Sequence, residues 1–219
     1  MFPIIFEKKM NSVTSRGKVF IGLISLLAWF ALFAQLYIHL TVLPFPVKEQ
    51  IIRYFSYFTI LSNLMVAISC TMLFIGNGTD GGRFFHRQSV VAAITVYIVI
   101  VGAVYNLVLR SVWDPRGLQK VVDELFHTVN PILYLLMWIF VAGKDQLNWK
   151  MVFPWLIYPI VYCIFILIRG RASGFYPYPF INVTELGINK TVQNIGILSI
   201  SFLLVSLLCV AIGKRMSRH

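Results

Sequence analysis

Long apolar stretches follow one another along the chain, separated by short segments rich in glycine, proline and polar residues. A helix needs about 20 apolar residues to cross a hydrocarbon core of about 30 Å, and each stretch is long enough, the fourth and fifth only just. The stretches are continuous rather than alternating, which favours helices over a β-barrel. The pattern predicts an all-α polytopic membrane protein, a bundle of six transmembrane helices. The expected spans are residues 19–43, 54–75, 90–109, 125–141, 152–168 and 192–212.

Composition supports this fold class and leaves no room for a separate soluble domain. Of the 219 residues 58% are hydrophobic and only 12% are charged, whereas an ordinary soluble domain is about 25% charged. We therefore expect a single transmembrane domain over residues 1–219. The apolar stretch after the basic N-terminal segment is too long for the core of a signal peptide, so we expect an uncleaved first span.

The positive charge points to topology rather than to a nucleic-acid partner. The net charge is +11, but the 19 Lys and Arg residues are spread over tails and short loops and form no single basic face. The tails and the second and fourth loops hold 11 of them, and the other three loops hold 8. Because cytoplasmic segments carry the excess of Lys and Arg, we expect a multi-pass protein of the cell membrane with both termini in the cytoplasm.

The sequence contains no motif for metal, nucleotide or soluble-esterase chemistry. Cys70, Cys163 and Cys209 each lie inside an apolar stretch, without disulfide or metal-ligand spacing. No H-E-x-x-H, G-x-x-x-x-G-K-[ST] or G-x-S-x-G segment occurs. We expect no metal and no cofactor, so any chemistry would be cofactor-free and the expected partners are membrane lipids.

A polar stripe marks the second stretch. Ser56, Thr59 and Asn63 fall at positions i, i+3 and i+7, which lie on one face of a helix. Ser and Thr in such a helix can bond to their own carbonyls while Asn joins helices together. Alternatively, the stripe lines a polar cavity that contains Thr59, about 9 Å below the start of its span by helix rise. Spacing alone leaves both interpretations open.

The third stretch carries Gly102, Asn106 and Arg110 at intervals of four, a line of small, amide and cationic side chains toward one membrane face. Arg110 could instead extend to the lipid headgroups. The fourth stretch carries a further stripe that includes an imidazole. Its members are Asp123, His127, Asn130, Tyr134 and Trp138.

Two prolines within the predicted helices free backbone carbonyls for other donors. Pro131 has no N–H for the carbonyl of His127, and Pro159 likewise leaves the carbonyl of Trp155 without its usual donor. An isolated histidine near a helix end is often an interfacial hydrogen-bonding residue. An ionisable group inside the membrane is nevertheless a functional candidate by default.

The topology of these spans brings the polar candidates toward one membrane face. The loop 169–189 begins with Arg169 and includes a stiff aromatic-proline segment around Tyr176, either an interfacial belt or a lid over a shallow pocket. A neutral histidine can take the proton of a threonine hydroxyl, which is the core of an acyl-transfer site. We therefore take Thr59 and His127 as catalytic candidates. The candidates for substrate binding or oxyanion stabilisation are Asn63, Asn106, Arg110, Arg169 and Tyr176.

Three segments resemble a known family: Tyr57-Phe58-Thr59-Ile60-Leu61-Ser62-Asn63, His127 with Pro131 and Trp138, and the loop from Tyr176 to Phe180. Over nearly its whole length the chain is similar to the bacterial six-span "Pr-six-Pr" membrane proteins. Those proteins look like distant relatives of the androgen-induced and androgen-dependent TFPI-regulating proteins, which hydrolyse fatty acid esters of hydroxy fatty acids. The resemblance implies an intramembrane threonine and histidine, matching Thr59 and His127.

The leading hypothesis is an intramembrane threonine hydrolase that cleaves a fatty acyl ester, with Thr59 as nucleophile and His127 as base. A small-solute transporter or lipid-binding protein is the alternative, in which the polar residues would accompany a solute. A third possibility is a structural membrane protein whose polar stripes only pack helices. The absence of detectable inverted repeats weakens the transporter hypothesis.

Overall fold

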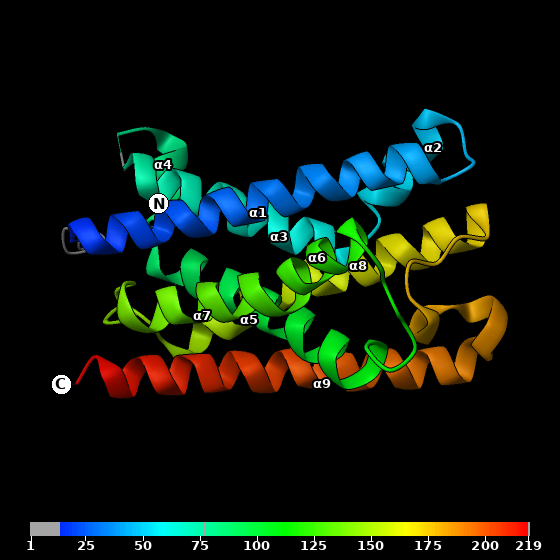
Figure 1. Cartoon of the computed structure of the whole chain (residues 1–219). Helices are drawn as coiled ribbons and strands as arrows, with labels where there is room; N and C mark the ends of the chain where they lie inside the picture. The colour runs from blue at the N-terminus through cyan, green and yellow to red at the C-terminus, as the bar shows by residue number, and fades with distance from the viewer. Residues whose placement is uncertain (1–13, 77, 219) are drawn as a thin grey trace.

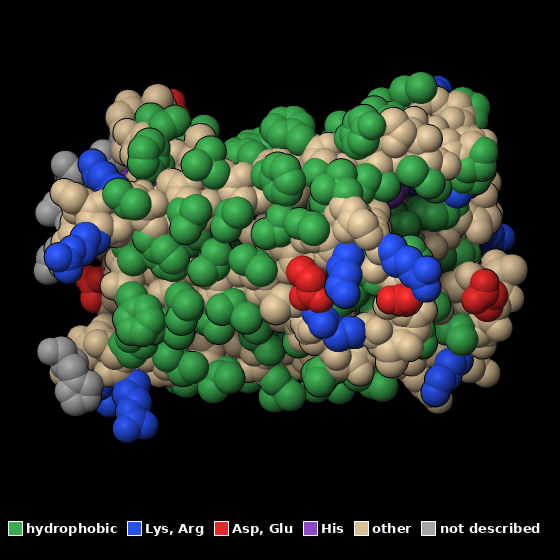
Figure 2. Space-filling view, viewed as in Figure 1, with side chains coloured by type: hydrophobic (Ala, Val, Ile, Leu, Met, Phe, Trp, Pro, Cys, Tyr) green, Lys and Arg blue, Asp and Glu red, His purple; other side chains and the backbone are tan. Residues whose placement is uncertain are grey.

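The computed structural model describes residues 14–76 and 78–218, and within them every regular element is helical. The tail residues Lys8 and Lys9, which entered the charge count, lie outside the described residues. Five helical segments are long and apolar enough to cross a membrane, and apolar side chains cover much of the surface in Figure 2. The chain is therefore an all-helical integral membrane protein. The five segments are Ser15–Val42, Phe58–Ile75, Gln88–Leu109, Trp149–Ser173 and Val183–Met216.

The long helices lie side by side, and the two described ends of the chain lie at the same end of the bundle (Figure 1). The long elements are α1 (Ser15–Val42), α3 (Phe58–Ile75), α5 (Gln88–Val104), α8 (Val152–Ser173) and α9 (Val183–Met216). Shorter helices are α2 (Val47–Tyr54), α4 (Asp80–Phe85), η3 (Trp149–Met151) and η4 (Pro179–Ile181). The remaining elements are the π-helical turn η1 (Tyr105–Leu109), which continues α5, and the consecutive α6 (Leu118–Glu124), η2 (Leu125–Val129, π-helical) and α7 (Asn130–Phe140).

Burial ranks the helices from the centre of the bundle outward. In the most apolar window of each span, 67% of the residues of α5 and η1 are buried, against 28% for α8 and 22% for α9. The continuous helical segment α6–η2–α7 and α3 pack beside α5, and α8 packs against α9. Helix α5 is therefore central, whereas α8 and α9 form an outer wall with much of their surface uncovered.

The second predicted span was wrong at its start. The apolar stretch begins at Tyr54, but α2 ends there and α3 starts only at Phe58. Apolar residues continue through the break, so hydropathy does not reveal it. Ser56 lies in the break and donates to the carbonyl of Ile52 at 2.6 Å, so it does not share a helical face with Thr59. Thr59 is the second residue of its helix rather than a point about 9 Å below its start.

Other boundaries move because charged residues enter helices. The fourth stretch was predicted to start at residue 125, but the helix begins at Leu118 and includes Asp123, which lies beside His127, and Glu124, which pairs with Arg110. Helix α9 begins at Val183, well before residue 192, and bends at Gly187, where φ is 73°. Between α8 and α9 the connection therefore shrinks to residues 174–182, which contain η4.

Both carbonyls that proline was predicted to free have side-chain donors from the central helix. The Asn106 amide donates to the carbonyl of His127 at 3.0 Å. The Tyr97 hydroxyl donates to the carbonyl of Trp155 at 2.8 Å. The missing proline N–H in α7 and α8 is thus replaced in each case across a helix–helix contact.

Candidate active site

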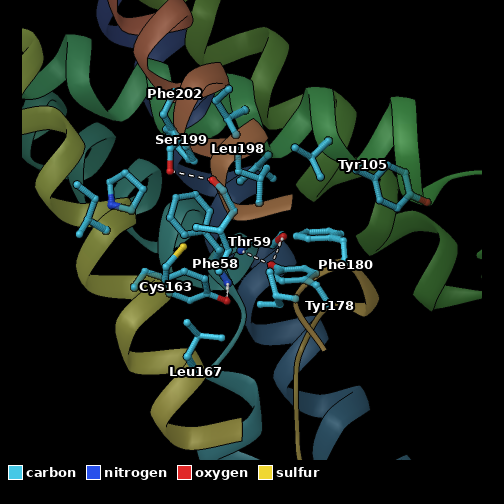
Figure 3. Close-up of a pocket in the computed structure, with 18 of the residues that line it drawn as sticks. Phe58, Thr59, Tyr105, Cys163, Leu167, Tyr178, Phe180, Leu198, Ser199 and Phe202 are labelled. Atoms are coloured by element: carbon cyan, nitrogen blue, oxygen red, sulfur yellow. Dashed lines mark hydrogen bonds between the residues drawn. The ribbon is translucent and has the colours of Figure 1, made fainter. Parts of the chain in front are cut away.

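A cavity of about 380 Å³ lies between the central helix and the outer wall, and its polar groups include Thr59 and Tyr178 (Figure 3). Its walls come from the start of α3, from α5 and η1, from α8 and α9, and from the segment that includes η4. Most of the lining is aliphatic or aromatic, which suits an apolar ligand with few polar groups. The aliphatic wall residues include Ile100, Val104, Leu156, Ile160, Leu167, Ile195 and Leu198.

Thr59 lines this cavity at the N-terminus of α3 and is 8% exposed. Its side-chain oxygen Oγ1 lies 3.4 Å from Nε2 of His127 and 3.2 Å from the hydroxyl oxygen of Tyr178. Its backbone N–H donates to the same Tyr178 oxygen at 3.1 Å. The preceding residue is also held by a tyrosine, because Phe58 N–H donates to the Tyr162 hydroxyl at 3.1 Å. Two tyrosines thus satisfy N–H groups that a helix start leaves without intrahelical partners.

His127 presents one nitrogen to Thr59 and the other to its own helix. Its Nδ1 lies 2.9 Å from the backbone carbonyl oxygen of Asp123. A carbonyl only accepts, so in the neutral imidazole this contact places the proton on Nδ1 and leaves the Nε2 lone pair facing Thr59. That tautomer is the one that a general base for the threonine hydroxyl requires.

A stacked ring and a buried carboxylate hold the imidazole in place. The ring of Tyr105 stacks on that of His127 with centroids 4.0 Å apart and an interplanar angle of 12°. The Asp123 side-chain oxygen Oδ1 lies 3.4 Å from His127 Nδ1, and the Asp123 side chain is only 7% exposed. The Tyr105 hydroxyl also interacts with this carboxylate. A proton taken up by His127 would therefore meet a negative charge next to it.

The stacked pair comes from the two π-helical turns. Tyr105 opens η1 and His127 is the central residue of η2. A π-helical turn bonds residue i to i+5 and is often found at functional sites. Because such a turn holds more residues, it rotates the positions that follow it relative to an α-helix. The predicted line Gly102, Asn106, Arg110 nevertheless stays on one side of the helix, facing η2. A Cβ on Gly102 would lie against the His127 carbonyl oxygen, which Asn106 binds, and Arg110 donates to Thr128.

Neither predicted amide faces the cavity, which corrects their proposed oxyanion role. The Asn63 Nδ2 donates to the carbonyls of Thr59 and Phe126 at 3.0 and 3.3 Å. The Asn106 Nδ2 donates to those of Gly102 and His127 at 2.8 and 3.0 Å. Both N–H groups of each amide are thus engaged, and neither residue lines the cavity. The two asparagines hold helices together beside the site.

Neither predicted arginine lines the cavity. Arg110 pairs with Glu124 at 2.7 Å and donates to Thr128 at 3.1 Å, at an exposed position. Arg169 lies 3.3 Å from Glu49, which also binds Arg53 at 2.7 Å. The ion pair between Arg169 and Glu49 connects the end of α8 to α2.

The tyrosine that reaches Thr59 is Tyr178 rather than the predicted Tyr176. The Tyr176 ring packs over Gly170, where an added Cβ would overlap it. Tyr178 lies two positions further along the loop, and its ring stacks on Phe180 at 5.1 Å. Tyr176 alone was a predicted site residue, and the Tyr-Pro-Tyr-Pro sequence does not distinguish the two tyrosines. Burial raises the pKa of Tyr178 to about 12, so its hydroxyl stays protonated at neutral pH.

In residues 14–76 and 78–218 no group of three or more His, Cys, Asp or Glu side chains is arranged to hold a metal ion. Of the residues singled out from the sequence, the structure brings together Thr59 and His127, with Asn63 and Asn106 behind them. The missed members of the site are Tyr178, Tyr105 and Asp123. Asp123 already belonged to the polar stripe of the fourth stretch, four residues before His127.

Comparison with protein-family models, with curated proteins and with solved structures finds no match to this chain.

Proposed function

We propose that the protein is an intramembrane threonine hydrolase that cleaves a fatty acyl ester, with Thr59 as nucleophile and His127 as general base. The observation that carries the proposal is the contact of 3.4 Å between Thr59 Oγ1 and His127 Nε2 at the wall of an apolar cavity. Catalytic hydrogen bonds are often long in the absence of substrate, and a contact of this length can shorten when substrate binds. The distant resemblance to the androgen-induced and androgen-dependent TFPI-regulating proteins points to the same two residues.

The mechanism follows the direction of the hydrogen bonds. Thr59 Oγ1 attacks the ester carbonyl carbon while its proton passes to His127 Nε2. The resulting imidazolium lies beside the Asp123 carboxylate, which supports the charge and keeps the ring oriented. His127 then returns the proton to the departing alcohol, and a water activated by the same imidazole releases the fatty acid.

The cavity favours an acyl chain over a small polar solute. Its lining is mostly aliphatic and aromatic, whereas a path for a hydrophilic solute would need polar groups along its length. A lipid-binding protein without catalysis would use the same cavity. The Thr59–His127 contact is the feature that a purely binding role does not require.

The proposed topology has six spans, with α6–η2–α7 as the fourth. Residues 118–140 are helical throughout, although their charged start separates them from the five apolar spans. The two described ends lie at the same end of the bundle (Figure 1), as an even number of crossings requires. We place both termini in the cytoplasm of a cell-membrane protein, from the excess of Lys and Arg on that side.

A fluorophosphonate probe and a long-chain p-nitrophenyl ester test the proposal on the full chain in detergent or proteoliposomes. Thr59→Ala should abolish both labelling and turnover, because it removes the attacking oxygen, and Thr59→Ser should keep part of each. The matched control is Ser199→Ala, since Ser199 lines the same cavity but its hydroxyl donates to the Ile195 carbonyl at 2.8 Å.

Undiminished labelling and turnover in Thr59→Ala would refute the threonine mechanism. Loss of both in Ser199→Ala alone would move the nucleophile to α9. Binding of the ester without turnover or labelling in any variant would leave a lipid-binding protein, and flux of a polar solute into proteoliposomes would favour a transporter.

A further inference from the structure

The Tyr178 hydroxyl makes two contacts with the same residue, Thr59. It lies 3.1 Å from the Thr59 nitrogen and 3.2 Å from Oγ1, and these hydroxyls are joined by a dashed line in Figure 3. The side chain comes from the connection between α8 and η4, far from Thr59 in sequence. A contact made only to cap the helix would need the backbone bond alone.

The positions of the protons in these hydrogen bonds follow from the tautomer of His127. With the His127 proton on Nδ1, the Thr59 hydroxyl donates to Nε2 and its oxygen is left to accept. The Tyr178 oxygen already accepts the Thr59 N–H, so its own O–H is the donor toward Oγ1. The bonds therefore run in one direction, from Tyr178 through Thr59 to His127 and on to the Asp123 carbonyl.

We propose that the Tyr178 hydroxyl is the oxyanion donor of the threonine hydrolase, a role that rests on the function proposed above. When Oγ1 forms its bond to the carbonyl carbon, the carbonyl π electrons move onto oxygen, and the Thr59 proton goes to His127. The oxyanion is attached to the carbon that Oγ1 has just joined, so a hydroxyl 3.2 Å from Oγ1 needs only to turn its hydrogen to reach it. Collapse of this intermediate restores the C=O bond and expels the alcohol.

The surroundings of Tyr178 keep its oxygen fixed while the hydrogen turns. Its ring stacks on Phe180 and meets the edge of Tyr57 at 5.8 Å. Pro177 and Pro179 flank it and restrict the backbone on either side. The Thr59 N–H donates to the Tyr178 hydroxyl oxygen at 3.1 Å. A donor that is already in position costs little reorganisation when charge develops.

The test compares p-nitrophenyl decanoate with its thionoester, in which sulfur replaces the carbonyl oxygen. Sulfur accepts hydrogen bonds weakly, so an oxyanion donor contributes much less to thionoester cleavage. Tyr178→Phe should lower kcat for the oxygen ester by about 10²–10³-fold, the usual effect of removing one such donor. The thionoester rate should fall far less, so the ester-to-thionoester ratio should drop. Tyr176→Phe is the matched control, because Tyr176 belongs to the same loop but lies outside the cavity lining.

An equal loss on both substrates would overturn the proposal and leave Tyr178 as a helix cap. An unchanged rate in Tyr178→Phe would also overturn it. Activity in Thr59→Ala would instead refute the threonine mechanism itself, so the two failures are distinguishable. If Tyr178→Phe does not fold, 3-fluorotyrosine at position 178 keeps the hydroxyl but makes it more acidic. It should change the ester rate and leave the thionoester rate unaltered, and the reverse result would contradict the donor role.

Discussion

The side-chain amide of Asn106 donates a hydrogen bond of 3.0 Å to the backbone carbonyl of His127, four residues before Pro131. Removing this donor should destabilise the bundle and disturb the imidazole, because the carbonyl loses the partner that replaces the proline N–H. We expect Asn106→Leu to lower the free energy of unfolding by about 0.6–1.5 kcal/mol, the range for such bonds. Esterase turnover should fall as well.

The control for this variant is Tyr97→Phe. It removes the donor to the Trp155 carbonyl, which Pro159 frees in the same way. Both variants should lower the melting temperature measured in detergent, but only Asn106→Leu should lower turnover at a temperature where both remain folded. Equal loss of turnover in the two would show that activity follows general stability rather than the position of His127.

Gly102 packs closely against the helical segment that carries His127. A Cβ at this position would lie 3.1 Å from both the His127 carbonyl oxygen and Pro131 Cβ. We expect Gly102→Ala to cost about 1–3 kcal/mol, as overpacked sites do, and to lower turnover. Gly196→Ala in α9 is the control, because its Cβ would meet nothing within 4 Å.

At Gly196 the better helix propensity of alanine should leave stability unchanged or raised. Thermal unfolding of the two variants measures the difference directly. A melting temperature for Gly102→Ala equal to that of the unsubstituted protein would mean that α5 and α7 can move apart without penalty.

The pH dependence of the site should have no alkaline decline from Tyr178 below pH 11. Burial raises its pKa from 10.0 to about 12, so the hydroxyl remains a donor through the range in which an exposed tyrosine ionises. The rate of fluorophosphonate labelling between pH 8 and about 11 measures this. A decline centred near pH 10 that disappears in Tyr178→Phe would contradict the burial of this hydroxyl.

The helical bundle could be predicted from the sequence because lipid imposes a simple rule on apolar length. The ends of the spans could not, because they depend on side-chain partners. Asp123 and Glu124 look like the limit of a span by hydropathy, yet their partners His127 and Arg110 let the helix continue past them. The break at residues 55–57 is invisible for the opposite reason, since it occurs among apolar residues.

The contact between Thr59 and His127 could be anticipated because the second and fourth spans run in the same direction, so both begin at one membrane face. The choice between Tyr176 and Tyr178 could not, because it depends on which ring packs over Gly170. The π-helical turn η1, whose first residue stacks on the imidazole, is likewise not foreseen by spacing rules based on the α-helix. Asn106 shares a side with Gly102, as its spacing predicts, but it binds the backbone of His127 rather than a ligand.

The volume of the cavity should limit the length of the acyl chain that it accepts. Leu198 lines the cavity, and Leu198→Trp would fill part of its volume of about 380 Å³. We expect a large loss of turnover with p-nitrophenyl palmitate and little change with the butyrate, since only the long chain needs the filled space. Leu204→Trp is the control, because Leu204 lies on the same helix at 59% exposure.

Cys163 provides the second measurement, since its side chain lines the same cavity, whereas Cys70 and Cys209 are buried elsewhere. In a Thr59→Ala background, bound palmitate ester should slow the reaction of Cys163 with a maleimide, and Leu198→Trp should remove that protection. This readout does not depend on hydrolysis, so it tests where the acyl chain lies even if Thr59 is not the nucleophile. Protection that persists in Leu198→Trp, or an equal loss in Leu204→Trp, would mean that the chain binds outside the cavity between α5 and the α8–α9 wall.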